Sequence, residues 1–200
     1  MDLELEGRHA LVQVRPHRRG LRVRVTHGLV SALLLVVLAA PLPSPAKTPG
    51  EVEVGQLLRD ATLRGLNGPP RKLSEFRGRP LIINVWASWC GPCRAETASL
   101  ERLAWSDAGQ HFAIIGISTD DHLQAAQAWL QRSNATVSHF IDERLLMEYM
   151  LGATHMPLTV LVDADGRVLE KVFGAKEWDG AEALRLIARA FRNPRIAPLR

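Results

Sequence analysis

The domain-sized part of the chain, residues 51–200, shows two kinds of apolar pattern. Residues 81–87 and 112–118 are near-continuous apolar runs rich in β-branched side chains, as expected of strands buried on both faces of a sheet. Apolar positions at helical spacing follow each run, over residues 91–104 and 122–132. The pattern therefore predicts strands that alternate with helices.

Turn signals predict a hairpin on either side of this region. The β-rich runs at residues 158–162 and 168–173 flank an Asp-Gly pair, which is a strong hairpin signal. Earlier in the chain, residues 61–66 and 71–73 flank an Asn-Gly-Pro-Pro turn and predict an extra N-terminal β-hairpin. A short helix is expected around residues 145–150.

Acidic residues stand where helix caps are expected. Asp120 or Asp121 should cap the second helix, and Asp179 should cap a last helix over residues 180–191. Residues 192–200 should form a loose tail. The predicted order is a hairpin, then βαβα, then ββα, which corresponds to an α/β three-layer sandwich with a mixed central sheet.

The first fifty residues follow a different pattern. Six arginines and three acidic residues precede an uncharged apolar run, and a proline-rich stretch comes after it. This predicts a basic cytoplasmic flank at residues 1–27, a signal-anchor or signal-peptide core at 28–42, a Pro-rich linker at 43–50 and one domain at 51–200. The core is shorter than the roughly 20 residues that span a bilayer, and an uncleaved anchor is favoured over a cleaved signal.

Composition narrows the class of protein. The 200 residues are 46% hydrophobic and 23% charged, which suits one globular domain with an appendage and excludes a wholly disordered or fibrous chain. Beyond residue 27 there are 19 basic and 18 acidic residues, so a nucleic-acid-binding surface is not indicated. Two cysteines cannot build a disulfide-stapled scaffold.

Both cysteines stand in one Cys-x-x-Cys motif at the junction of the first buried strand and its helix. Cys90 falls at the helix N-terminus, where unpaired N–H groups and the helix dipole stabilise a thiolate. Pro92 suits the first turn because it lacks an N–H. We expect Cys90 to be the exposed attacking thiolate and Cys93, one turn further, to resolve the mixed disulfide.

Three other roles for the two cysteines are a zinc site, a structural disulfide and a copper(I) site. Zinc needs two more ligands, and the sequence has neither a second Cys-x-x-Cys nor a closely spaced histidine pair. A permanent structural disulfide that closes so short a loop removes little entropy from the unfolded chain and therefore stabilises the fold only slightly. A copper(I) site is the sharper alternative, with His155 or Met156 as an additional ligand.

A longer motif surrounds the cysteines, IINVWASWCGPCRAE at residues 82–96. It resembles the active-site stretch of the TlpA/ResA branch of thioredoxin-like proteins. MPLTVLVD at residues 156–163 resembles the cis-proline strand of that branch, and GAKEWD at residues 174–179 is similar to its TlpA subgroup. The resemblance covers about residues 51–191. It implies a thioredoxin-like fold and a membrane-anchored, extracytoplasmic thiol-disulfide oxidoreductase.

The resemblance also implies roles for individual residues. Pro157 should be cis and should pack beside the two sulfurs. Met156 should offer its backbone N–H and C=O to an extended client segment. Trp89 should belong to an exposed apolar rim, and Gly91 and Pro92 should line the client-binding surface with it.

Glu96 is the expected catalytic carboxyl beside the cysteines. Asn84 stands where thioredoxins carry a buried, proton-relaying Asp, and an amide cannot titrate. Glu96 lies one turn beyond Cys93 on the same helix side, as in the family. A partly buried carboxyl there should have a raised pKa and exchange protons with Cys93. A solvated surface acid is the alternative.

The predicted function is that of a protein-disulfide reductase whose only redox group is the disulfide Cys90–Cys93. The resemblance implies reduction of cysteine pairs in cytochrome c maturation or in assembly of the cytochrome oxidase copper site. The implied partners are cysteine-containing clients, a membrane thiol-disulfide electron donor, and the bacterial inner membrane through residues 28–42, with the domain in the periplasm.

Other functions remain open at this point. A copper(I)-binding delivery module would use Cys90 and Cys93 with Met156 or His155. A peroxidase on this fold would need Thr or Ser at position 87, which is Ala87. An inert docking adaptor would not need its cysteines. Three further histidines are expected at the surface, namely His111, His122 and His139.

Overall fold

The structure is a computed structural model that describes residues 48–197. The predicted cytoplasmic flank, the predicted anchor and most of the predicted linker lie outside these residues. Among the residues described, we find no helix with the length and apolar character needed to cross a membrane.

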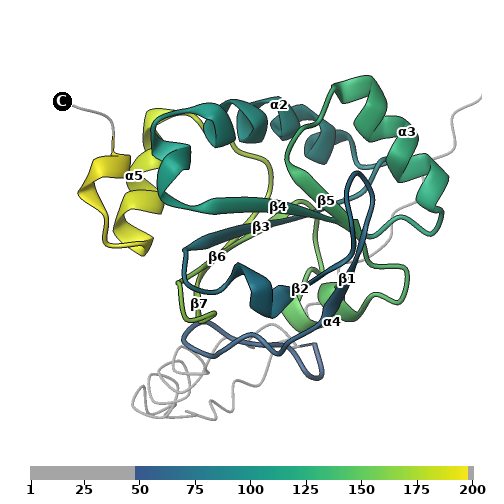
Figure 1. The fold of residues 1–200 in the computed structure, drawn as a ribbon, viewed down its shortest axis with the longest axis horizontal. Coiled ribbons are helices and arrows are strands. Elements are labelled where there is room, and N and C mark those ends of the chain that lie inside the picture. Colours follow the sequence, from purple (N-terminus) through teal and green to yellow (C-terminus); the bar gives the residue numbers. More distant parts are fainter. Residues whose placement is uncertain (1–47, 198–200) are drawn as a thin grey trace, which may run out of the picture. The chain divides into compact units, whose positions relative to one another are not determined.

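A seven-stranded mixed sheet runs through the domain in the order β2-β1-β5-β4-β3-β6-β7 (Figure 1). Strands β3, β4 and β5 are parallel to one another, while β6, β7, β1 and β2 join by antiparallel pairing. The strands are β1 Thr62–Gly65, β2 Arg71–Lys72, β3 Leu81–Trp86, β4 Ala113–Ser118, β5 Ser138–Ile141, β6 Leu158–Val162 and β7 Val168–Phe173. The predicted mixed sheet and N-terminal hairpin are confirmed.

Helices cover both faces of this sheet. In Figure 1, α2, α3 and α5 lie on one side and α4 lies on the other, so the domain has three layers. The helices are α2 Gly91–Trp105, α3 Leu123–Ser133, α4 Leu146–Leu151 and α5 Ala181–Ala190, with short 3-10 turns η1 Leu73–Phe76, η2 Ala108–His111 and η3 Pro194–Ile196.

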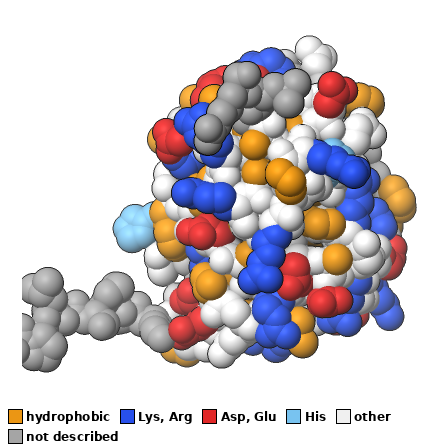
Figure 2. Space-filling model, turned by 90° about the vertical axis from the view of Figure 1, so that its left-hand side faces the viewer, with side chains coloured by type: hydrophobic (Ala, Val, Ile, Leu, Met, Phe, Trp, Pro, Cys, Tyr) orange, Lys and Arg blue, Asp and Glu red, His pale blue; other side chains and the backbone are white. Residues whose placement is uncertain are grey.

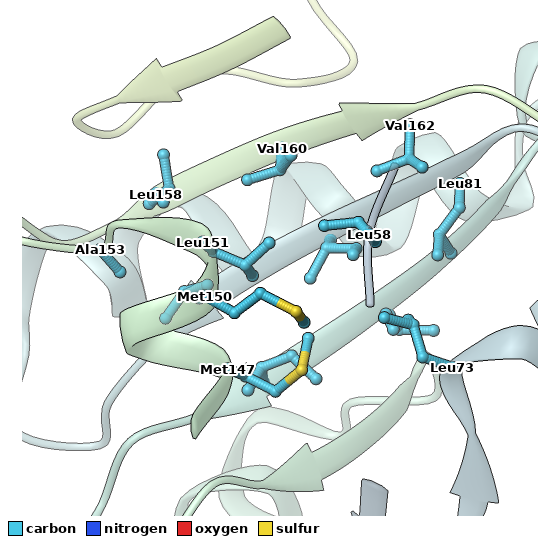
Figure 3. Close-up of a cluster of buried hydrophobic side chains, with 14 of the residues drawn as sticks. Leu58, Leu73, Leu81, Met147, Met150, Leu151, Ala153, Leu158, Val160 and Val162 are labelled. Carbon is cyan, nitrogen blue, oxygen red and sulfur yellow. The ribbon is translucent and has the colours of Figure 1, made fainter. Parts of the chain in front are cut away.

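Alternate side chains of β3 face two different cores, which is why its sequence is apolar at every position except Asn84. Ile83 belongs to the cluster in Figure 3, where Met147, Met150 and Leu151 of α4 pack against the sheet. Ile82 belongs to a cluster on the opposite face, with side chains from α2 and α5. All six residues of β3 are buried, so its carboxyl end is a firm support for the cysteine motif.

Strand β5 is missing from the sequence prediction. It has only four residues, and it begins with Ser138 and His139 rather than with an apolar run. Its place depends on pairing with β4 on one side and β1 on the other. Such long-range pairing leaves no mark on a short local pattern.

The predicted acidic caps are wrong. Helix α3 begins after His122 and α5 begins after Gly180, and neither of these residues makes a side-chain cap bond. Asp120 accepts hydrogen bonds from the loop before the cysteines. Asp179 binds Arg102. Both carboxylates therefore serve tertiary contacts instead of helix ends.

The predicted loose tail is also wrong for the residues described. Asn193 accepts a hydrogen bond from the N–H of Arg195 and caps η3. Ile196 is buried in the same cluster as Ile187 of α5. The chain is therefore packed up to this turn.

Candidate active site

Cys90 and Cys93 form a disulfide at the N-terminus of α2, with their Cα atoms 5.3 Å apart. Cys90 is the N-cap of the helix, and its Sγ accepts the N–H of Cys93 at 3.2 Å. Pro92 lies in the first turn, as predicted. Helix α2 follows the buried strand β3 after a short loop. The fold therefore fixes the position of both sulfurs.

The exposure of the cysteines partly corrects the prediction. Cys90 is 6% exposed and Cys93 is 1% exposed, so the expected order holds, but Cys90 is buried rather than exposed. Its side chain belongs to an apolar cluster with Trp86 and Trp129. This cluster shields the disulfide from water on its inner side.

Of the residues predicted to bind the client, Trp89 directly precedes Cys90, and Gly91 and Pro92 lie between the two cysteines. Trp89 is 67% exposed, and Gly91 and Pro92 are exposed as well. The Met156–Pro157 peptide bond is cis, as predicted. Met156 is half-buried and packs against the apolar cluster that contains both cysteines.

A buried carboxylate that the sequence does not reveal holds the loop before the cysteines. Asp120 is 3% exposed and accepts the N–H of Ser88 at 2.9 Å and its hydroxyl at 2.6 Å. The hydroxyl of Ser118 also donates to this carboxylate, at 2.7 Å. The end of β4 therefore fixes the loop that carries Trp89.

The same segment also contacts the cis-proline loop. Thr119 donates its hydroxyl to the Sδ of Met156 at 3.3 Å. The residues between β4 and α3 thus contact both loops of the candidate site. His155, which was weighed with Met156 as a copper ligand, is exposed, and its Nδ1 lies 3.1 Å from the hydroxyl of Thr154.

Glu96 is buried and engaged by three N–H donors. It is 2% exposed. Its Oε1 accepts the side-chain amide of Asn84 at 2.8 Å, and its Oε2 accepts the backbone N–H of Lys176 at 3.1 Å and the indole N–H of Trp178 at 3.0 Å. Burial raises the pKa of Glu96, although the three donors oppose it. The carboxyl is more deeply buried than the partly buried group that was predicted, and the direction of its pKa shift agrees with the prediction.

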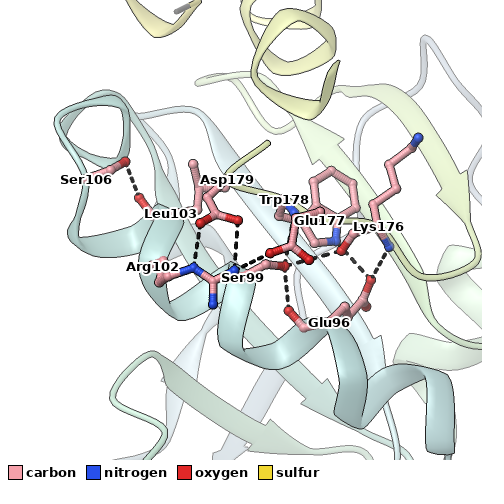
Figure 4. A network of polar contacts seen from close by, with 9 residues as sticks. All are labelled: Glu96, Ser99, Arg102, Leu103, Ser106, Lys176, Glu177, Trp178 and Asp179. Carbon is pink, nitrogen blue, oxygen red and sulfur yellow. Dashed lines mark hydrogen bonds and ion pairs between the residues drawn. The ribbon is translucent and has the colours of Figure 1, made fainter. Parts of the chain in front are cut away.

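Glu96 is the first of three α2 side chains that hold the loop between β7 and α5 (Figure 4). Ser99 accepts the backbone N–H of Trp178 at 3.0 Å. Arg102 pairs with both Glu177 and Asp179. Spacing of three residues puts these side chains on one helix face. Hydrogen bonds and ion pairs from three successive turns of α2 therefore hold this loop.

His139 corrects another prediction. It was expected at the surface, but it is 7% exposed, and neither ring nitrogen has a hydrogen-bond partner. Burial lowers its pKa to about 4. The residue lies in β5, so the error has the same origin as the missing strand.

Two further features of the described residues are the distribution of charge on one face and the placement of metal-ligating side chains. On the face shown in Figure 2, which is the left-hand side of Figure 1 where α5 is labelled, basic and acidic side chains are interspersed. Within residues 48–197, no three or more His, Cys, Asp or Glu side chains are grouped in a way that could hold a metal ion.

A disulfide at a strand-to-helix junction, a cis-proline at the start of a neighbouring strand and a mixed sheet between helices define a thioredoxin-fold thiol-disulfide oxidoreductase. The family is established by comparison. The chain belongs to the redoxin family, whose model matches residues 53–185.

Proteins similar to this chain are named for thiol-disulfide exchange. The chain is 34% identical over 147 residues to the thiol:disulfide interchange protein DsbE of Vibrio cholerae, with 69% of this chain and 78% of that protein covered. It is 28% identical over 125 residues to the thiol-disulfide oxidoreductase ResA of Geobacillus kaustophilus, with 62% and 71% covered.

A solved structure supports the fold. A Chlorobium tepidum protein described as a DsbE-type thiol:disulfide interchange protein superposes with a TM-score of 0.64 and 25% identity. The match covers 70% of this chain and 99% of the other.

Proposed function

We propose that this protein is an extracytoplasmic reductant of client disulfides, with Cys90 and Cys93 as the catalytic pair. The observation that carries the proposal is the disulfide at the N-terminus of α2, next to the exposed Trp89. A thiolate at Cys90 would be stabilised by the helix dipole and by the N–H of Cys93, which already points at its sulfur.

The reaction transfers two electrons to the client. In the dithiol form, the Cys90 thiolate attacks one sulfur of the client disulfide, and the other client sulfur leaves as a thiolate. Cys93 then gives its proton to Glu96 and attacks the Sγ of Cys90. The second client sulfur leaves, the client holds two thiols once protonated, and the Cys90–Cys93 disulfide is restored. A membrane thiol donor supplies the next two electrons.

Glu96 serves this cycle because its protonation state can follow that of Cys93. The two residues are one turn apart on α2, and both are buried. A carboxyl with a raised pKa accepts a proton nearer to neutral pH than an exposed one.

The client should bind as an extended segment across the two loops of the site. Trp89, Gly91 and Pro92 form the exposed part of this surface, and Met156 with the cis Pro157 forms its other side. Backbone groups of Met156 would pair with the client, as in strand addition.

The proposed clients are the cysteine pairs of cytochrome c or of the cytochrome oxidase copper site. The TlpA/ResA-like motif supports this choice, and the names of similar proteins support thiol-disulfide exchange as the reaction. The proposed location is the periplasmic side of a bacterial inner membrane, with residues 28–42 as the anchor.

The equilibrium redox potential of the Cys90–Cys93 pair tests the proposed direction. We expect a value near that of thioredoxin, about −270 mV. A potential above about −180 mV, in the range of protein disulfide isomerase, would overturn the reductant assignment. Trapping of clients by Cys93→Ser, which stalls the mixed disulfide, would identify them.

A further inference from the structure

A row of buried polar residues crosses four strands behind the cysteine motif. Strand pairing places Thr159 of β6, Asn84 of β3, Gly116 of β4 and His139 of β5 at matched positions. Side chains at matched positions of neighbouring strands point to the same face of a sheet. Thr159, Asn84 and His139 therefore share the face that carries α2 and Glu96.

Gly116 is the gap in this row, and the ring of His139 covers it. A Cβ atom on Gly116 would lie 2.0 Å from Nδ1 of His139. The imidazole of His139 thus occupies the space above Gly116, on the side toward Asn84. A cavity of about 10 Å³ is lined by Asn84, Gly116 and His139, which is near the smallest volume that holds one water molecule.

The two oxygens of Glu96 differ in what their partners can do. Oε2 receives a backbone N–H from Lys176 and an indole N–H from Trp178, and both groups can only donate. Oε1 receives the amide of Asn84, a side chain that offers donors at one end and an acceptor at the other. A proton on the carboxyl needs an acceptor, and only Oε1 has a partner that can provide one.

Thr159 can adapt in the same way. Its hydroxyl now accepts from Nδ2 of Asn84 at 3.0 Å. A hydroxyl can donate as well as accept. If the side-chain amide of Asn84 flipped so that its O and N atoms exchanged places, its oxygen would accept hydrogen bonds from the protonated Glu96 carboxyl and from the Thr159 hydroxyl. Its NH₂ group would then face the cavity shared with His139, whose ring nitrogens have no partner.

We propose that Asn84 and His139 are positioning residues for Glu96. When Oε1 of Glu96 takes up a proton, the Asn84 amide rotates so that its oxygen accepts that proton while its N–H donates toward His139, directly or through one water. Thr159 serves both orientations. The use of this proton in exchange rests on the role of Glu96 proposed above, whereas the rotation itself does not.

The charged groups around Glu96 do not compete for this proton. On the loop beside it, Lys176 Nζ binds Glu182 and Glu177 binds Arg102. On its own helix, Arg94 is exposed and Cys93 is held in the disulfide of the oxidised protein. Glu101, which lines the cavity, accepts the backbone N–H groups of Thr136 and Val137. Across the cavity, the pKa of His139 is lowered to about 4 by burial, so its ring is neutral at neutral pH and can accept.

Nuclear magnetic resonance of the oxidised full-length protein tests the rotation. We expect the side-chain amide signals of Asn84 to titrate with the same midpoint as the carboxyl carbon of Glu96. In the acid form, contacts from the amide protons to Thr159 should be replaced by contacts to the ring protons of His139. Amide signals that stay constant through the Glu96 titration would overturn the proposal.

A matched pair of variants tests the part played by His139. His139→Phe keeps a ring of similar size but removes the acceptor, so the acid form of Glu96 should be weakened and its titration midpoint should fall. The loss of one neutral hydrogen bond corresponds to about 0.7 pH units. His122→Phe, which replaces an exposed histidine instead, should leave the midpoint in place.

An equal midpoint in His139→Phe and the wild type would remove His139 from the proposal. These titrations need no turnover, so they separate this proposal from the proposed function. If Glu96→Gln left the exchange rate and its pH profile unchanged, Glu96 would lose its catalytic role, yet the coupled titration would still stand or fall on its own.

Discussion

The indole N–H of Trp178 is one of three donors on the buried carboxyl of Glu96, and it is fixed because the ring is fully buried. A donor stabilises the carboxylate more than the acid, so this contact lowers the pKa of Glu96 against the effect of burial. Trp178 thereby affects the active site although it lies at the far end of the chain.

Trp178→Phe should raise the pKa of Glu96 further, because one donor to the carboxylate is lost while burial remains. The acid limb of the thiol-exchange rate should move to higher pH by up to about one unit. The measurement is the pH profile of exchange with a model disulfide. Trp105→Phe, which removes an exposed indole hydrogen bond on the same helix, should leave the profile in place; equal profiles in both variants would contradict the assignment.

At this scale the sequence predicts the residues that follow a local rule. Glu96 could be predicted because its place one turn beyond Cys93 puts it on a known side of the helix. Trp178, Asp120 and His139 could not, since their partners lie far away in the chain or, for His139, its strand was not predicted. An Asp before a helix looks like a cap until the loop that it binds is known.

The segment between β4 and α3 is the element that joins the two loops of the site. Asp120 holds Ser88 in the cysteine loop, and Thr119 holds Met156 in the cis-proline loop. A change in this segment should therefore affect exchange without altering either cysteine.

Asp120→Ala should slow exchange and lower the free energy of unfolding by about 1–3 kcal/mol, because the partly buried donors of Ser88 and the buried hydroxyl of Ser118 lose their acceptor. Denaturant unfolding and exchange kinetics provide the two measurements. Asp121→Ala changes the exposed neighbour and should be close to neutral in both. Wild-type behaviour of Asp120→Ala would show that the loop holds its position without this carboxylate.

Strand β4 depends on a residue without a side chain. Gly116→Ala would place a Cβ 2.0 Å from Nδ1 of His139, which should destabilise the fold by about 1–3 kcal/mol. Gly68→Ala, at a position with no atom within 4 Å of the added carbon, is the control. Adding His139→Ala to Gly116→Ala should restore part of the loss if the ring is the cause, and strictly additive effects would exclude it.

At the scale of elements, long patterns were predictable and short ones were not. The buried runs that became β3 and β4 are six residues each, and their helices follow directly. Strand β5 has four residues, only two of them large and apolar. Its position depends on pairing with the flanking strands β1 and β4. The local hydrophobic pattern does not predict such pairing.

For the whole molecule, the buried His139 links folding to pH. Its pKa is lowered to about 4 in the folded protein, against about 6.5 in an unfolded chain. The unfolded state therefore binds this proton first as the pH falls. The stability associated with neutral His139 is fully present above pH 6.5 and is lost as the pH falls to about 4.

His139→Phe removes this dependence. The variant should gain stability relative to the wild type as the pH falls from 6.5 to about 4, by on the order of 3 kcal/mol, and the difference should level off below that range. Chemical denaturation of both proteins across the range gives the difference directly. His122→Phe, at an exposed histidine, is the control, and a constant difference between His139→Phe and wild type would contradict the buried, neutral state.

The attachment of α2 to the loop between β7 and α5 has a consequence for any attempt to exchange active sites between relatives. Glu96, Ser99 and Arg102 all end on residues 176–179, some eighty positions later in the chain. A chimera that imported only the CGPC helix would leave these three side chains facing a foreign loop. The smallest transplantable unit of this oxidoreductase is therefore two segments, not one motif.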